Sequence, residues 1–199
     1  MTFDDIAADV LPLLHGIPQP RAERALLRCA QQLCRSARIW REWTESVQVQ
    51  GAGEHDVEVP PGAQVDVVEA MTVDGRARPM LPWGFVPGAP DEARGGAVVP
   101  GRLVFHVGAG VPKGAQVRFR VSLLPSDDAA SIPDDVFRPH AALLAEGVIG
   151  QCMADVGRPW SSGDAGGHLA LFEQGVARAG VREWRSNTDI TPRQRVQWC

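Results

Sequence analysis

Hydrophobic residues recur at helical spacing near both ends of the 199-residue chain. In the segment 20–43 they form one stripe within about 80° on a helical projection. Its members are Ala22, Leu26, Cys29, Leu33, Ala37 and Trp40. Similar spacing predicts helices over about 3–11, in a block that opens at Pro133, and over 164–184. Both ends of the chain are therefore predicted to be helical.

Between 46 and 125 the hydrophobic pattern changes to a period of two. Valines alternate with polar residues in short runs, and turn sequences separate these runs. The pattern predicts half-buried antiparallel strands, about five to seven in number. Asp74-Gly75 is the strongest hairpin turn among the turn sequences. In the strand predicted over 116–124, apolar residues on one face alternate with Arg118 and Arg120 on the other.

Helical ends that flank a strand-rich middle predict an α+β fold. We expect a helical core of about four helices, built from the N- and C-terminal segments, with an inserted antiparallel β-domain. The predicted parts are N-terminal helices, the β-domain, C-terminal helices and an extended tail, over 1–45, 46–125, 126–185 and 186–199, respectively.

Composition narrows the class of protein without indicating a reaction. Hydrophobic residues make up 44% of the chain and charged residues 22%, which excludes a disordered acidic chain, a collagen and a coiled coil. No apolar run is long enough to predict a transmembrane helix, so no membrane contact is expected. The first residues lack the features of a signal peptide.

Charge is unevenly distributed along the chain, whose formal net charge is −4. Residues 51–100 carry eight acids against three arginines, whereas residues 178–199 carry five arginines against two acids. In the helix predicted over 20–43, four arginines lie opposite the apolar stripe: Arg21, Arg24, Arg28 and Arg35. These side chains are either solvated or form a surface for a neighbouring subunit or an anionic partner.

No motif in the sequence is specific for a catalytic, cofactor or metal site. The five histidines have no metal-ligand spacing, and we expect no bound metal or cofactor. One alternative is a small thiol-dependent hydrolase with Cys152 and His168 as its reactive pair. The apolar residues around Cys152 instead favour a position in the core. Another alternative is a carbohydrate- or peptide-binding module that uses Trp83 and Phe85 in the loop 82–96.

Three stretches of the sequence resemble a known family. They are 10–14 with Pro18 and Pro20, then 25–30 with Cys34-Arg35 and Trp40, and finally Pro133-Asp134, 146–149, Pro159-Trp160 and 172–179. On these residues the two helical ends of the chain resemble the head–tail connector (adaptor) proteins of tailed bacteriophages. The predicted β-domain is similar to theirs only in kind.

The resemblance implies a structural virion protein and not an enzyme. Members of the family have a four-helix core interrupted by a β-domain, and they form a ring, usually of twelve copies, beneath the portal vertex. The ring extends the DNA channel and docks the next neck or tail protein. For this chain the implied partners are the portal protein, further neck or tail proteins, other copies of itself, and passing DNA that it does not bind specifically. The implied location is the virion neck, after synthesis in the host cytoplasm.

The resemblance also implies a role for the C-terminal tail, and a physical argument about DNA passage adds a hypothesis for the acidic β-domain. A C-terminal segment of such proteins commonly docks on the portal, which implies this contact for Arg193, Arg195 and Trp198; the alternative is a disordered end. A ring through which DNA slides should not hold phosphates tightly. The acidic candidates for the channel surface are Asp56, Glu58, Asp66 and Glu69. They are equally compatible with ordinary outward positions on strands. We expect a monomer before assembly.

Overall fold

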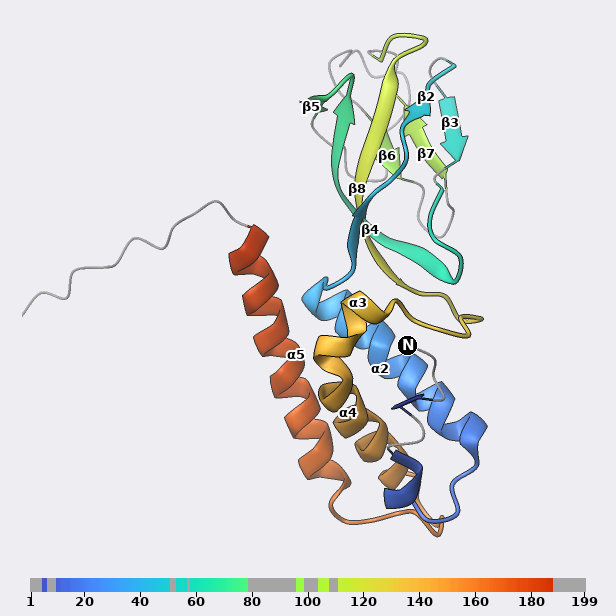
Figure 1. Cartoon of the computed structure of the whole chain (residues 1–199), viewed down its shortest axis with the longest axis vertical. Helices are drawn as coiled ribbons and strands as arrows, with labels where there is room; N and C mark the ends of the chain where they lie inside the picture. Colours follow the sequence, from blue (N-terminus) through green and yellow to red (C-terminus); the bar gives the residue numbers. More distant parts are fainter. Residues whose placement is uncertain are drawn as a thin grey trace, which may run out of the picture. The chain divides into compact units, whose positions relative to one another are not determined.

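The chain divides into two compact units in a computed structural model, which describes residues 5–6, 10–50, 53–56, 58–78, 96–98, 104–107 and 111–187. By its described residues, one unit comprises Trp40–Val136 and is built mainly of strands; we call it the β unit. The other comprises the described residues within Asp4–Ile39 and Phe137–Cys199, which are mainly helical; we call it the helical unit. The prediction of an α+β fold is confirmed (Figure 1).

The described strands of the β unit form two antiparallel sheets. The larger sheet has the order β1-β8-β4-β5, and β2 also pairs with β8. Its strands are β1 (Arg41–Trp43), β2 (Val47–Gln48), β4 (Ala63–Val73), β5 (Arg76–Arg78) and β8 (Gln116–Pro125). The smaller sheet has the order β3-β7-β6, from β3 (Gly53–Asp56), β6 (Gly96–Val98) and β7 (Val104–Val107).

The long antiparallel ladder between β4 and β8 organises the larger sheet (Figure 1). At the predicted turn, Asp74 and Gly75 both have positive φ angles, 48° and 75°, and β5 returns alongside β4. The backbone N–H of Gln116 donates to Asp74 Oδ1 at 2.9 Å, which ties the turn to the start of β8. The predicted hairpin is therefore confirmed, and a side-chain acceptor anchors it.

Strand β8 presents the predicted alternation of faces. Val117, Phe119 and Val121 are at most 1% exposed. Arg118 is exposed and Arg120 half-buried, so these two arginines lie on the opposite, wetter face. Apolar residues on one face of β8 thus form the core of the β unit.

Strand β1 corrects the predicted extent of the first long helix. We predicted helix over 20–43, but the helix α2 (Gln19–Ala37) ends earlier. Arg38 adopts the left-handed conformation with φ 51°, and its N–H donates to Cys34 O at 2.8 Å, which closes the last turn. Residues 41–43 are instead extended and pair with β8. The stripe had included Trp40 because a buried side chain at helical spacing does not show where a helix ends.

Three long helices make up most of the helical unit. They are α2, α4 (Ala141–Met153) and α5 (Ala165–Asn187), and each of them packs against the other two. The short elements are η1 (Leu11–Leu13), η2 (Arg138–His140) and α3 (Asp134–Phe137), which spans the boundary between the units. Of the helix predicted over 3–11, residues 3–4 and 7–9 lie outside the described residues, and residues 5, 6 and 10 are helical. The number of four core helices therefore stays a prediction.

Glycines let α4 approach its neighbours closely. A Cβ atom added to Gly147 would lie 2.7 Å from Cys29 Sγ on α2 and 2.8 Å from Phe172 Cδ2 on α5. One added to Gly150 would lie 2.8 Å from Leu169 Cγ. The core of the helical unit is therefore tightly packed where all three helices meet, and this packing sets the helix faces that remain outside.

Candidate interaction surfaces

Helix α2 exposes a row of arginines on the side opposite its apolar stripe. Arg24, Arg28 and Arg35 are exposed, and none of them forms an ion pair with another residue in the described part of the chain. The three positions share one helix face because they are separated by four and seven residues. We call Arg24, Arg28 and Arg35 the basic surface of α2.

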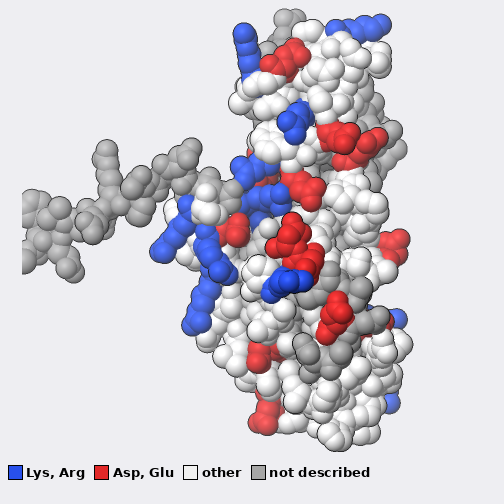
Figure 2. All heavy atoms as spheres, viewed as in Figure 1, with Lys and Arg blue, Asp and Glu red and all other residues white. Residues whose placement is uncertain are grey.

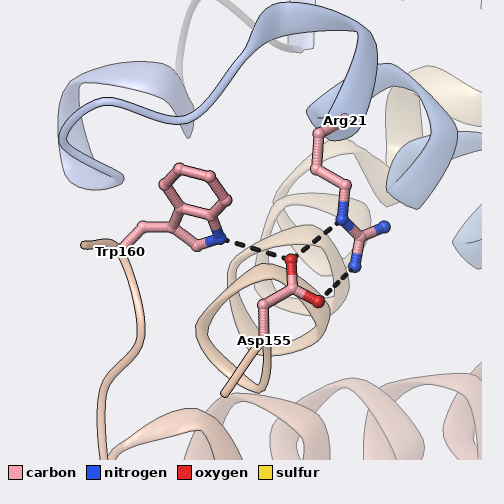
Figure 3. Close-up of polar contacts among 3 residues, drawn as sticks. All are labelled: Arg21, Asp155 and Trp160. Carbon is pink, nitrogen blue, oxygen red and sulfur yellow. Dashed lines mark hydrogen bonds and ion pairs between the residues drawn. The ribbon is translucent and has the colours of Figure 1, made fainter. Parts of the chain in front are cut away.

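Arg21, which was predicted to share this surface, is engaged inside the helical unit. Its Nε and Nη2 donate to both carboxylate oxygens of Asp155, at 2.9 and 2.7 Å (Figure 3). The indole Nε1 of Trp160 donates to the same carboxylate at 3.2 Å. The hydrogen bonds from Arg21 hold the pKa of Asp155 below its ordinary value. The ion pair between Arg21 and Asp155 therefore connects the first turn of α2 to the segment that follows α4.

Glu69, one of the four acidic candidates for a channel surface, is also engaged within its own unit. It lies at a register shift in the β4–β8 ladder, between Val68 and Ala70. Its Oε1 accepts from Arg41 Nε at 2.8 Å, and its Oε2 lies 3.4 Å from Arg120 Nε. The Glu69 side chain is only 14% exposed. Because β8 lies between β1 and β4, Arg41 reaches Glu69 across a whole strand, so the ion pair clamps three strands together.

The other acidic candidates do not form one described cluster with Glu69. Glu58 is exposed and Asp66 is half-buried. Asp56 lies on β3, in the smaller sheet, and its side chain lies outside what the structure describes. Glu58 and Asp66 remain available to solvent, so the expectation of an acidic surface now rests on fewer residues.

Other predicted positions lie outside the described residues altogether. These are the tail residues Arg193, Arg195 and Trp198, and the loop residues Trp83 and Phe85. A portal contact through the tail and a ligand-binding loop both stay predictions.

The structure does not bring Cys152 and His168 together as a reactive pair. Cys152 is fully buried, and burial raises the pKa of its thiol to about 11. Burial, with a smaller effect from Cys152, raises the pKa of Cys29 to about 12. The partner of His168 is Glu146, whose Oε2 lies 2.7 Å from its Nδ1. A thiol with a raised pKa is protonated at neutral pH, which is the reverse of what a nucleophilic cysteine needs.

Neither a metal centre nor a membrane span is found among the described residues. No group of three or more histidine, cysteine, aspartate or glutamate side chains is arranged to hold a metal ion in the part of the chain that the structure describes. No helix there is both long and apolar enough to cross a membrane.

Helix α5 carries a second exposed surface, which the sequence analysis missed. Leu171, Val181 and Trp184 are 55%, 50% and 61% exposed. Three exposed arginines accompany them: Arg178, Arg182 and Arg185. Figure 2 shows basic side chains projecting from the C-terminal half of this helix. We call these six residues the outer face of α5. Extending the helical projection to the residues outside the buried stripe would have revealed it.

Comparisons with known proteins do not assign the chain to a family. No protein-family model matches the chain, and no curated protein sequence matches it. A functional assignment therefore rests on the residues and their geometry.

Proposed function

We propose that the chain is a structural head–tail connector (adaptor) protein of a tailed bacteriophage. In this role its copies form a ring beneath the portal, extend the DNA channel and dock the next neck or tail protein. The observation that carries the proposal is that segments before and after the β unit in the sequence form one helical unit, so that the β unit is an insertion in the chain. That order of elements is the one implied by the family that the sequence resembles.

The basic surface of α2 supports the proposal because it is available to a neighbour. Its arginines are exposed, whereas Arg21 on the same helix is satisfied by Asp155. A guanidinium group binds carboxylates and carbonyl oxygens in a fixed fork geometry, and arginine is enriched at protein interfaces. We therefore assign Arg24, Arg28 and Arg35 to a contact with the portal or with the next copy in the ring.

The acidic residues of the β unit have a narrower role in this proposal. Glu69 holds the sheet together, because two arginines share its carboxylate. Exposed Glu58 and half-buried Asp66 are the remaining described candidates for a surface that faces passing DNA. Carboxylates there repel phosphate. They also form no cationic contacts with the DNA, so no counterions are released and DNA is not bound tightly.

The proposal is tested by binding to portal particles of the virus that encodes the chain. We expect the wild-type chain to co-sediment with the particles, and the double variant R24E/R28E to lose at least about ten-fold in affinity. Reversing charges at a contact adds repulsion to the lost ion pairs. The matched control is R76E/K113E, which makes the same change in net charge at two exposed positions of the β unit.

Two outcomes contradict the proposal in different ways. If the wild-type chain fails to co-sediment with portal particles, the connector role is wrong. If both double variants bind as tightly as the wild type, the role survives but the basic surface of α2 is not the contact.

A further inference from the structure

The outer face of α5 combines exposed apolar side chains with arginines on one helix. Successive separations of seven and three residues place Leu171, Arg178 and Val181 on the same side, and Trp184 and Arg185 follow at helical spacing. The opposite side of α5 is committed to the core, where Phe172 and Ala179 are 1% exposed.

The apolar part of this face is unusual for a surface. Leu171, Val181 and Trp184 are three of the six large hydrophobic residues that are exposed in the described part of the chain. Val181 and Trp184, three residues apart, are neighbours on the helix surface, and Leu171 lies further along the helix. Exposed apolar residues that gather on one element mark a contact surface, whereas single ones need no explanation. Tryptophan and arginine are also the residues that contribute most to binding energy at protein interfaces.

The charged side chains in the C-terminal half of this face are mostly arginines, whereas the exposed Glu173 lies nearer the start of the helix. From residue 177 to 186 the exposed charged side chains are Arg178, Arg182 and Arg185, and the half-buried Glu183 is the sole acid in that stretch. A basic partner is excluded by repulsion. A second copy that used the same face would bring three more arginines to the contact, and their repulsion disfavours a symmetric dimer through it.

We propose that the outer face of α5 is the docking site for an acidic segment of another protein that also carries apolar residues. Carboxylates of the segment pair with Arg178 and Arg185, and its apolar side chains cover Leu171, Val181 and Trp184. The long stems of the arginines add apolar contact area while their charged ends pair. The site is on a different helix from the basic surface of α2, and it does not depend on the connector role.

Charge and chemistry favour a protein segment over nucleic acid or lipid. The chain has a net charge of −4 and presents only three arginines on this face. Binding to a phosphate backbone grows with the number of cationic contacts and gains nothing from leucine or valine. Binding to an anionic membrane needs a broader apolar face with several cationic residues around it.

Selection from a library of random twelve-residue peptides on the immobilised full-length chain tests this proposal. We expect the selected peptides to be enriched in aspartate and glutamate together with leucine, phenylalanine or tryptophan. Fluorescence anisotropy then measures the Kd of one synthetic peptide from the enriched set. The variant R178E/R185E is expected to weaken it by at least about ten-fold. Arg182 is left unchanged because its charge contributes to the lowered pKa of His140.

Two matched controls separate this site from bulk charge and from general stickiness. R76E/K113E reverses two exposed cationic residues of the β unit and should change the Kd by less than about two-fold. V181Q removes an exposed apolar residue from the site and should weaken the peptide, whereas L13Q, at a residue that is 60% exposed on η1, should not. Circular dichroism checks that each variant is folded. If R178E/R185E unfolds, R178A/R185A replaces it, with R76A/K113A as its control.

Several results would overturn the proposal. Enrichment of basic or uncharged peptides would refute the partner chemistry. Equal weakening by R178E/R185E and R76E/K113E would mean that net charge alone attracts the peptide. Binding of phosphatidylglycerol vesicles, or of a single-stranded oligonucleotide, that is tighter than the peptide and is abolished by R178E/R185E would assign the face to lipid or to nucleic acid instead.

Discussion

Two carboxylates, Glu69 and Asp155, illustrate how single residues fasten each unit. Each of them joins segments far apart in the sequence, since Arg41 lies 28 positions from Glu69 and Arg21 lies 134 positions from Asp155. Sequence periodicity predicts that such polar residues lie on the outward face of an element, but it does not show which residues they pair with. Glu69 and Arg21 were therefore predicted to be surface residues, whereas in the structure both form ion pairs within their own units.

Replacing Glu69 should destabilise the β unit. E69Q keeps the shape of the side chain and removes its charge, so the guanidinium of Arg41, which is only 16% exposed, loses its ionic partner. We expect the free energy of unfolding to fall by about 2 kcal/mol. Urea denaturation measures it, and E58Q is the control at an exposed glutamate. A loss no larger than that of E58Q would show that the clamp contributes little.

Asp155 should make the stability of the helical unit depend on pH. Its pKa is lowered in the folded state from the ordinary 3.8, chiefly by hydrogen bonds from Arg21. The stabilisation is therefore present above the unfolded-state pKa and is lost as the pH falls through the lower, folded-state pKa.

The variant D155N tests this dependence. It should lower the free energy of unfolding by about 1 kcal/mol at pH 7. The difference from the wild type should shrink as the pH is lowered below about 4. Urea titrations across this range measure both effects, with E173Q as the control at an exposed glutamate of α5. A difference that stays constant with pH would mean that the Arg21–Asp155 pair does not cause it.

At the level of whole helices, substitutions at Gly147 and Gly180 distinguish the effect of tight packing on stability from the effect of helix propensity. In G147A the new methyl group meets Cys29 and Phe172, both buried, so the helices must shift apart. In G180A the nearest atom lies at 3.5 Å, which is ordinary contact distance. The first substitution should destabilise the chain by about 1–3 kcal/mol, and the second should stabilise it by about 0.5–1 kcal/mol. Thermal unfolding measures both changes. Equal effects would show that packing around Gly147 is looser than described.

Much of the element structure was predictable because amphipathic periodicity reports burial directly. The stripes in α2 and α5 and the alternation in β8 are confirmed by buried residues such as Leu26, Phe172 and Phe119. Strand β1 was not predictable, because the turn that precedes it depends on Arg38 in a left-handed conformation that arginine rarely adopts. The outer face of α5 was not predicted because a buried stripe at helical spacing does not show which of the remaining side chains stay exposed.

In the whole molecule, the division of the chain into a helical unit and a β unit is the feature that supports the connector role. Segments from both ends form one helical unit, and the strands between them form another. The helical unit exposes two helix faces, the basic surface of α2 and the outer face of α5, and we propose both as contact surfaces. A ring of head-to-tail contacts uses two different patches of each subunit for its neighbours, and the next component of the assembly needs a further surface.

Cryo-electron microscopy of the full-length chain mixed with portal particles tests the central claim most directly. We expect a closed ring of copies bound to the portal. Arg24, Arg28 and Arg35 should lie in its contact with the portal or with the next copy in the ring. Portal particles that carry no added density, with the chain still monomeric in solution, would contradict it.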